Sequence, residues 1–563
     1  MKKFLIISLF SLAIFPAFSQ KKKQAKTPAA SQKADTLIPG KTVIVTSEFS
    51  PVLKAVSKIN FNADSPAPDS VLPVLQYDVP PQNITFSYLS PPLKPLSQNI
   101  DSTVDWENKS FVKLGYGNFT TPYLQLGLSS GNGTESILNV FGKYTSSKGP
   151  LPYQQFSKTN LEGIGIFTSP DQQHEWTGRI YFDNNNQYLY GFSYDSLNPV
   201  KKEDLKQNFT SFGGKLSLRN KTINSIGINY QPSIAIDIFG DNHSGSETGF
   251  TLEAPATKEI VENLNLDVSL TTELVSYKNP SHTINNNLYF LKPAVRYETG
   301  GLKLTGGFTP SWDNGNFALL PNFTAEAKLN EEKFVLQAGW IGYYQKGSYQ
   351  SLANYNPFIR QPENLLNSKI REQYAGFKGA AGSHITYGGK VSYLQIDNQP
   401  LFVNDTITGR SFIVTYEPSL KALQLHGEIG YTIQERFSLL GGLNFNQYSS
   451  LNNNEKAWGL IPMEITGSLR WWVLKDVLLK GDLFFKSGSP YRNQQLESKN
   501  LSPATDLNLG VEVKITPSLN AWLQFNNVLN DKYQRWNQYE TLGFNVLGGI
   551  VYNFGDFRSV MNK

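Results

Sequence analysis

The alternation of residues between Leu542 and Phe554 constrains the fold more than any other feature of this chain. Small or polar residues such as Asn545 and Asn553 lie among the intervening positions. A period of two places the two sets on opposite faces of a β-strand. An aromatic residue that closes such a strand near a chain end is typical of a transmembrane β-barrel, so Phe554 is the predicted barrel-closing aromatic. The alternating apolar positions are Leu542, Phe544, Val546, Gly548, Ile550, Tyr552 and Phe554.

The same period recurs from Phe111 onward, for example over residues 264–270, 423–433 and 507–515. Several of these runs reach the roughly 9–11 residues that a tilted membrane strand needs, whereas strands of soluble sheets usually have about 5–6 residues. We therefore predict an all-β fold, a transmembrane antiparallel β-barrel over residues 109–554. Residues 555–563 would form a C-terminal tail.

Connections between the predicted strands are of two kinds. Short turns are expected near residues 131–133, 220–221, 330–332, 381–382, 435–436, 475–476 and 517. Longer connections are expected at 192–206, 347–370, 398–410, 488–504 and 529–540. Outer-membrane barrels have short periplasmic turns and long loops outside, and this pattern predicts about 22 strands, an even number that leaves both barrel ends periplasmic.

The first 19 residues have the pattern of a cleavable signal peptide. Lys2 and Lys3 precede an apolar run over residues 4–18, and Ala17 to Ser19 fit a small-x-small cleavage site. No later run reaches the about 18 apolar residues of a membrane helix. The chain has no Cys, which excludes disulfides, thiolate chemistry and a lipid anchor on cysteine. We predict export to the cell outer membrane.

Residues 20–108 differ in composition from the rest of the chain. Nine prolines occur between Pro51 and Pro95, including adjacent pairs at 80–81 and 91–92. Proline removes a backbone donor and favours extended or polyproline II conformations. This proline-rich arm is therefore predicted to be either a periplasmic extension or a segment that fills the lumen.

The stretch before the last strand resembles a known family. Residues 526–536 are similar to the "N-V-L-N-x-K-Y" segment that precedes the final strand in TonB-dependent receptors of Bacteroidota. This resemblance implies an outer-membrane barrel that moves a solute with help from an energy-coupling partner. The family carries a folded plug ahead of its barrel, whereas the arm has no recognisable full plug. The motif residues are Asn527, Leu529, Asn530, Lys532 and Tyr533.

A second short segment resembles the TonB box, which pairs with that energy-coupling partner. An ordinary extended segment is the alternative interpretation, because five residues make a motif of low specificity. The residues are Thr42, Val43, Ile44, Val45 and Thr46.

A barrel of about 22 strands encloses a wide lumen that is normally plugged. The arm could thread into it, long loops such as 347–370 could fold inward, or a partner could cap it. Alternating polar positions on two strands are expected to face the lumen, where they either solvate the interior or pair with whatever fills it. These residues are Lys480, Asp482, Lys486, Asn508, Glu512 and Lys514.

No constellation of residues predicts catalysis, a metal site or a cofactor. The five histidines lack ligand spacing, and a net charge of +5 is too small to argue for nucleic acid. Trp471 and Trp472 fit an interfacial girdle near a periplasmic turn. Tyr349, Tyr355 and Phe358 are expected either on the surface, where they could stack on sugars or a partner, or in a girdle.

The sequence therefore predicts an outer-membrane transporter or receptor, either gated or energised. The alternative is a non-transporting scaffold that docks partner proteins in an envelope complex. The expected partners are outer-membrane lipid, the outer-membrane insertion machinery, and a TonB-type coupling protein or another envelope protein.

Overall fold

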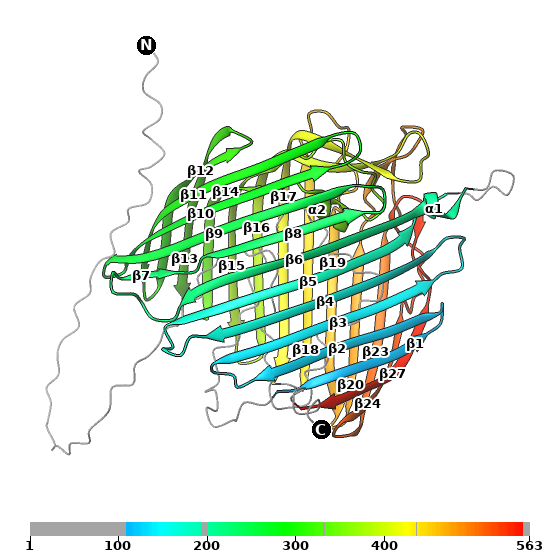
Figure 1. The fold of residues 1–563 in the computed structure, drawn as a ribbon, viewed down its shortest axis with the longest axis horizontal. Coiled ribbons are helices and arrows are strands. Elements are labelled where there is room, and N and C mark those ends of the chain that lie inside the picture. The colour runs from blue at the N-terminus through cyan, green and yellow to red at the C-terminus, as the bar shows by residue number, and fades with distance from the viewer. Residues whose placement is uncertain (1–107, 193–199, 330–332, 435, 556–563) are drawn as a thin grey trace, which may run out of the picture. The chain divides into compact units, whose positions relative to one another are not determined.

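The computed structural model describes residues 108–192, 200–329, 333–434 and 436–555. One antiparallel sheet contains 23 strand segments, and its first and last strands pair, so the sheet closes into a barrel (Figure 1). Two segments, β7 (Ile228–Tyr230) and β8 (Ser233–Asp241), share one position beside β9, which leaves 22 positions around the barrel. The predicted fold class and strand number are confirmed. The predicted signal peptide, nearly all of the predicted proline-rich arm and the TonB-box-like segment Thr42–Thr46 lie outside the described residues.

The long strands have the following bounds: β1 Ser110–Gly117, β2 Thr121–Gly131, β3 Ser136–Lys148, β4 Gln155–Thr168, β5 His174–Tyr188, β6 Lys206–Asn220, β9 Ser246–Val261, β10 Leu264–Lys278, β11 Thr283–Thr299, β12 Leu302–Asp313, β13 Asn316–Leu329, β14 Phe334–Gln345, β15 Ser368–Ala381, β16 Ile385–Asn404, β17 Phe412–Ile433, β18 Phe437–Ser449, β19 Met463–Leu474, β20 Val477–Lys486, β23 Ala504–Thr516, β24 Leu519–Asn526 and β27 Asn545–Phe554. Short elements lie in the loops: α1 Lys202–Leu205, α2 Tyr349–Tyr355, β21 Pro490–Arg492, β22 Ser498–Asn500, β25 Gln534–Trp536 and β26 Tyr539–Glu540. Among the described residues, no helix is long and apolar enough to cross a membrane.

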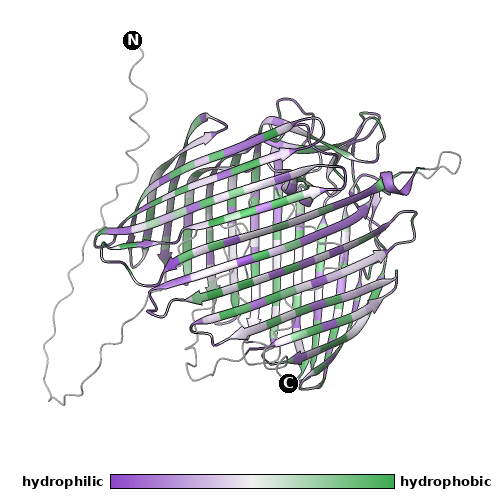
Figure 2. Cartoon of the chain, in the orientation of Figure 1, coloured by the Kyte–Doolittle hydropathy of each residue, from purple (hydrophilic) through white to green (hydrophobic). Residues whose placement is uncertain are grey.

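The strands carry apolar side chains on the outside of the barrel. On β27, Ile550 and Tyr552 are 45% and 53% exposed, while Leu547 and Val551 on the other face are buried. Figure 2 shows this alternation of hydropathy on strand after strand. A closed barrel with an exposed apolar face satisfies its backbone hydrogen bonds internally, which is what a membrane-spanning sheet requires.

The barrel closes where β1 meets β27. Their register runs from Ser110 opposite Phe554 to Gly117 opposite Leu547. The ring of Phe554 stacks on Tyr552 with centroids 5.9 Å apart, at the end that carries the short turns. The predicted closing aromatic is thus the last residue of the last strand.

Two connections differ from the sequence-based expectation. Residues 398–404 were expected in a loop, but they continue β16 and pair with β17 as far as Asn404 opposite Phe412. The wall is therefore taller there than a membrane strand requires. The connection after Asn220 is longer than the short turn that the sequence predicts. Within it, the Asn220 side chain takes the place of backbone hydrogen bonds between strands, because it donates to Ile228 O at 3.1 Å and accepts from Tyr230 N at 2.6 Å.

Candidate functional site: the closed mouth and the polar inner wall

The loop between β14 and β15, residues 346–367, folds inward across the long-loop end of the barrel, which we call the mouth (Figure 1). At the start of α2, Glu247 on β9 accepts the N–H groups of Tyr349 and Gln350 at 2.5 and 3.2 Å. A carboxylate in this position satisfies amide groups that have no partner within the helix. Glu247 thereby fixes the start of α2 to the inner wall.

Two side chains of the inward loop bind one carboxylate at the end of β8. Tyr349 Oη and Gln361 Nε2 each donate to Asp241 Oδ2 at 2.8 Å. Burial and the neighbouring Asp241 carboxylate raise the pKa of Tyr349 well above its ordinary value. The Tyr349 hydroxyl therefore stays protonated and remains a donor.

The same loop contacts strands on both sides of the mouth. Gln187 on β5 donates to Pro357 O, and Gln207 on β6 donates to Ile359 O at 3.4 Å. Ile359 also forms a parallel bridge with Phe412 at the start of β17. Because these strands are far apart around the barrel, the loop crosses the mouth rather than lining one side of it.

Aromatic side chains from two loops and the strand ends meet in this position. Trp536 packs against Tyr355, Phe402 and Phe412 with ring centroids 5.3–5.6 Å apart. These rings belong to the mouth cluster, which consists of Phe209, Phe239, Tyr277, Tyr349, Leu352, Ala353, Tyr355, Ile359, Leu365, Phe402, Phe412, Trp536 and Tyr539. Tyr349 and Tyr355 were expected on the surface or in a girdle; that expectation is wrong, because both are buried in this cluster.

Arg535 joins the loops that follow β14, β18 and β24. One guanidinium nitrogen donates to Tyr355 Oη at 2.9 Å and to Gly459 O at 3.1 Å. The guanidinium carbon also lies 4.1 Å from the ring centroid of Trp536. Charge-assisted hydrogen bonds and a cation–π contact thus connect three loops at one residue.

We expect Trp536→Ala to loosen the mouth without unfolding the barrel. Removing a buried indole costs about 3–5 kcal/mol, and here the loss falls on loops rather than on the strand ladder. Hydrogen exchange should accelerate in peptides that cover α2, while the barrel strands stay protected. Trp471→Ala is the matched control, because Trp471 is 40% exposed on the outer wall near a short turn. Equal hydrogen exchange of the α2 peptides in both variants would contradict the inference that Trp536 holds the mouth loops together.

The motif residue Asn527 organises the loop before the last strand. Its backbone adopts a φ of 47°, and its side-chain amide donates to Asp531 O at 2.8 Å and to Leu542 O at 3.0 Å. Its backbone N–H donates to Asn508 Oδ1 at 3.0 Å. Asparagine tolerates positive φ and makes such local bonds, which explains its place in the motif.

Other motif residues have similar structural contacts. Asn530 Oδ1 accepts the Phe544 N–H at 2.9 Å, and Tyr533 Oη donates to Asp506 Oδ2 at 3.1 Å. Leu529 is 53% exposed. The motif therefore shapes the loop that presents Arg535 and Trp536 to the mouth.

Glu417 on β17 anchors the loop between β18 and β19. Its carboxylate accepts the backbone N–H groups of Asn452, Asn453 and Asn454 at 2.7–3.2 Å and the Asn454 side chain at 3.0 Å. Glu417 is fully buried. Several N–H groups around one carboxylate make a strong anchor, because each bond is charge-assisted.

We expect Glu417→Gln to release this loop. The substitution places an amide NH₂ among N–H donors and costs about 1–3 kcal/mol for the groups left unsatisfied. Trypsin should then cut after Lys456 on the order of tenfold faster, as measured by mass spectrometry. Glu455→Gln on the same loop is the control, because Glu455 is exposed. An unchanged cleavage rate in Glu417→Gln would show that the anchor does not hold the loop.

The inner wall carries the polar residues that the sequence assigned to the lumen. They lie on β20 and β23, on the face opposite the exposed side chains of Leu483 and Leu509. Several of these residues pair with other residues of the wall or the loops. The ion pairs are Lys480 Nζ with Glu512 Oε2 at 2.9 Å, Arg470 with Asp482 at 3.3 Å and Lys486 with Glu464 at 3.8 Å. Asn508 Oδ1 accepts a hydrogen bond from the Asn527 N–H at 3.0 Å. Lys514 shares this face of β23. That these residues hold a lumen filler stays a prediction.

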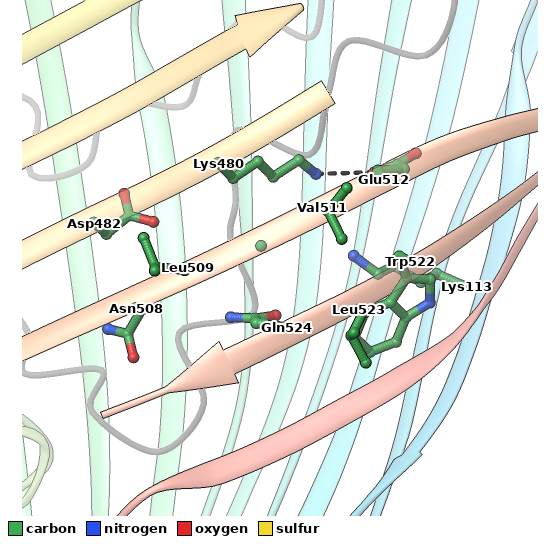
Figure 3. Close-up of a pocket in the computed structure, with 11 residues that line it drawn as sticks. Lys113, Lys480, Asp482, Asn508, Leu509, Val511, Glu512, Trp522, Leu523 and Gln524 are labelled. Atoms are coloured by element: carbon green, nitrogen blue, oxygen red, sulfur yellow. Dashed lines mark hydrogen bonds and ion pairs between the residues drawn. The ribbon is translucent and has the colours of Figure 1, made fainter. Parts of the chain in front are cut away.

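A small hollow opens on this wall where Gly510 has no side chain. Lys480 and Glu512 face each other along one side, and Trp522 and Gln524 lie on the other (Figure 3). Within the described residues, no group of three or more His, Asp or Glu side chains could hold a metal ion. The wall therefore offers paired charges and amides, which suit a hydrated interior or a peptide.

Sequence reasoning missed two features of the site. The sequence marks Arg535 and Trp536 only as neighbours of the motif, although they join the mouth loops. Leu547 and Val551 on the inner face of β27 were not assigned, because the polar residues around them suggested a wet face. Strict alternation would have found both, since they fall between the outward positions.

The chain is similar in structure to three outer-membrane proteins of known structure. The FrpB iron transporter from Neisseria meningitidis has a TM-score of 0.61 and 11% identity, with 80% of this chain and 82% of that chain covered. The ferripyoverdine receptor of Pseudomonas aeruginosa has a TM-score of 0.59 and 13% identity, covering 80% and 72%. The ferric enterobactin receptor PfeA of that organism has a TM-score of 0.59 and 10% identity, covering 80% and 81%. At these identities the likeness shows a shared barrel fold. No family model and no curated protein matches the sequence.

Proposed function

We propose that this protein is an outer-membrane transporter or receptor that moves a solute through a gated barrel, as TonB-dependent receptors do. One observation carries the proposal: a closed barrel of 22 strand positions has a paired polar inner wall and an inward loop that crosses its mouth. A barrel of this size encloses a wide lumen, and loops that open and close over such a path are a known way to gate it. The likeness to barrels named for iron compounds supports this function.

Gene deletion tests the transport proposal. A deletion strain should lose uptake of at least one solute in a panel that includes ferric siderophores, chosen because the similar structures carry those names. Complementation with the intact gene should restore uptake. If no uptake changes across the panel, the transport proposal fails. Loss of complementation when Thr42–Thr46 are replaced by alanine would support energy coupling through that segment.

A second candidate function is the scaffold in an envelope complex. The specific observation that favours it is how many bonds hold the mouth loop to the wall, among them those to Glu247, Asp241 and Gln207, because a loop fixed in this way suits a barrel that never conducts. In that case the protein should co-purify in fixed stoichiometry with other envelope proteins after mild detergent extraction, and solute uptake should not depend on it.

A further inference from the structure

Two cationic side chains and an amide lie side by side on the outer wall, where β15, β16 and β17 approach the mouth. Gln395 on β16 lies opposite Arg371 on β15 in one strand pair and opposite Lys421 on β17 in the other. Adjacent strands are about 4.8 Å apart, so the two cations flank the amide with about 10 Å between their backbones. We call these three residues the cationic row.

The cationic row faces away from the lumen, because each of its members follows the outward alternation of its strand. On the same face of these strands, Phe377, Tyr393 and Leu423 are exposed. The residues that alternate with them are buried in one cluster on the inner face: Ile370, Leu394, Ile396, Leu420 and Ala422. The row therefore belongs to the face of the wall that meets lipid.

An apolar belt continues from the row along the same strands, away from the mouth. Tyr393 and Leu423 come next on the outer face, and Val391 and Leu425 follow. All four side chains are exposed. Long loops mark the external end of an outer-membrane barrel, and aromatic residues such as Tyr393 mark the level of the headgroups. A lipid with its acyl chains on this belt would place its headgroup at the row.

The row carries more positive charge than its neighbours neutralise. Asp397, two residues beyond Gln395, lies 2.8 Å from Lys369 Nζ and 3.6 Å from Arg371. Arg371 Nε is buried and has no hydrogen-bond partner among the described residues. Lys421 is exposed and forms no ion pair within the described part of the chain. Three cations and one carboxylate leave a net charge of +2 here.

The next carboxylate along β17 does not neutralise this charge. Glu417 lies four residues before Lys421 and is fully buried, and its two oxygens accept the amides of Asn452–Asn454. The row thus keeps a guanidinium, an ammonium and an amide as donors. Guanidinium and ammonium groups are the side chains that bind phosphate oxygens, and the bonds are charge-assisted.

We propose that the cationic row binds the phosphate group of a lipid in the outer leaflet of the outer membrane. A phosphate group brings negative charge and several acceptor oxygens, which match the net charge and the donors of the row. A lipid fits better than free phosphate, because the adjoining belt would bury its acyl chains. The inference goes beyond the proposed function, since the site lies on the outer face of the wall and not along the path of a solute.

Binding of phosphorylated lipid A to the mature full-length protein tests the proposal. The protein is purified in a neutral detergent, and native mass spectrometry measures the fraction that holds lipid. Arg371→Gln/Lys421→Gln should weaken binding on the order of tenfold or more, because both cations are lost. The matched control, Lys148→Gln/Lys278→Gln, removes the same charge from exposed lysines that end β3 and β10, and should bind as the unchanged protein does. Equal affinities of the two double variants would overturn the proposal.

A single substitution keeps the test independent of folding defects. Lys421→Gln breaks no ion pair of the described residues, so the barrel should fold, and heat-dependent electrophoretic mobility verifies this. We expect this variant to bind phosphorylated lipid A several-fold more weakly than the unchanged protein. An unchanged affinity in the folded variant would overturn the proposal.

Two other ligands identify the group that is bound. Lipid A without phosphate groups should bind the unchanged protein at least several-fold more weakly than phosphorylated lipid A. Inorganic phosphate at the same concentration should leave the bound lipid in place. Equal binding of the two lipids would overturn recognition of the phosphate group, and displacement by inorganic phosphate alone would overturn the lipid as its source.

Discussion

A variant that lacks both residues 20–108 and the inward part of the mouth loop is expected to conduct as an open pore in a planar bilayer. Each single deletion is expected to stay near the closed level of the mature protein. The reason is that the mouth cluster and the proposed lumen filler are two barriers along the same path. In a variant that lacks only one of them, the remaining barrier still limits the ionic current. We expect the double variant to exceed each single deletion on the order of tenfold or more, since a barrel of this size has a wide lumen.

The loop deletion should replace residues 349–361 with a Gly–Ser linker, so that β14 and β15 remain connected. Replacement of residues 493–499 is the control, because that exposed hairpin adds no residue to the mouth cluster. Full conduction after removal of residues 20–108 alone would show that the mouth loop is not a barrier. A double variant that stays closed would favour the scaffold.

Lys390→Met is expected to destabilise the barrel by about 3–5 kcal/mol, the largest effect of any single substitution considered for the wall. Lys390 Nζ lies 2.6 Å from Glu372 Oε1, and their side chains are 6% and 2% exposed. Removing the cation leaves a buried carboxylate without its countercharge. The Ser392 hydroxyl, which donates to Glu372 at 2.7 Å, compensates only in part.

The double variant Lys390→Met/Glu372→Met should recover most of this loss, because two apolar side chains replace both charges. Unfolding by urea in lipid vesicles, followed by electrophoretic mobility, measures the free energy of each variant. Arg219→Met is the control, because the Arg219–Glu175 pair at 2.7 Å has its arginine 48% exposed and should contribute about 0–1 kcal/mol. Equal losses for Lys390→Met and Arg219→Met would contradict the argument.

The strands were predictable from the sequence because the two faces of each strand meet different surroundings. Lipid outside and a polar lumen inside impose a period of two, and that period fixes which residues of β10, β17 and β23 face outward. The predicted closing residue, Phe554, follows from the same local rule. Turn positions such as 381–382 and 475–476 also follow locally, since few residues connect adjacent strands.

The conformation of the mouth could not be predicted, because it depends on contacts between distant residues. The bond from Tyr349 to Asp241 joins positions 108 apart in the sequence, and the bond from Arg535 to Tyr355 joins positions 180 apart. No local pattern records such pairs. The inward positions of Leu547 and Val551 follow from alternation along the strand, but their contact with Trp522 does not, because Trp522 comes from another strand.

The pairing of β1 with β27 has a consequence for how the protein is made. The bonds between Asn118 and Val546 join residues 428 positions apart, so ribosomal synthesis must have passed Val546 before this contact can form. Contacts of such long range are slow to form, because a large loop must close first. Until then both strands are unpaired edges that other chains can add to, which is a route to aggregation. The final step of assembly is thus the most vulnerable one, and a catalyst that holds the two edges apart from other chains would be needed most at that moment.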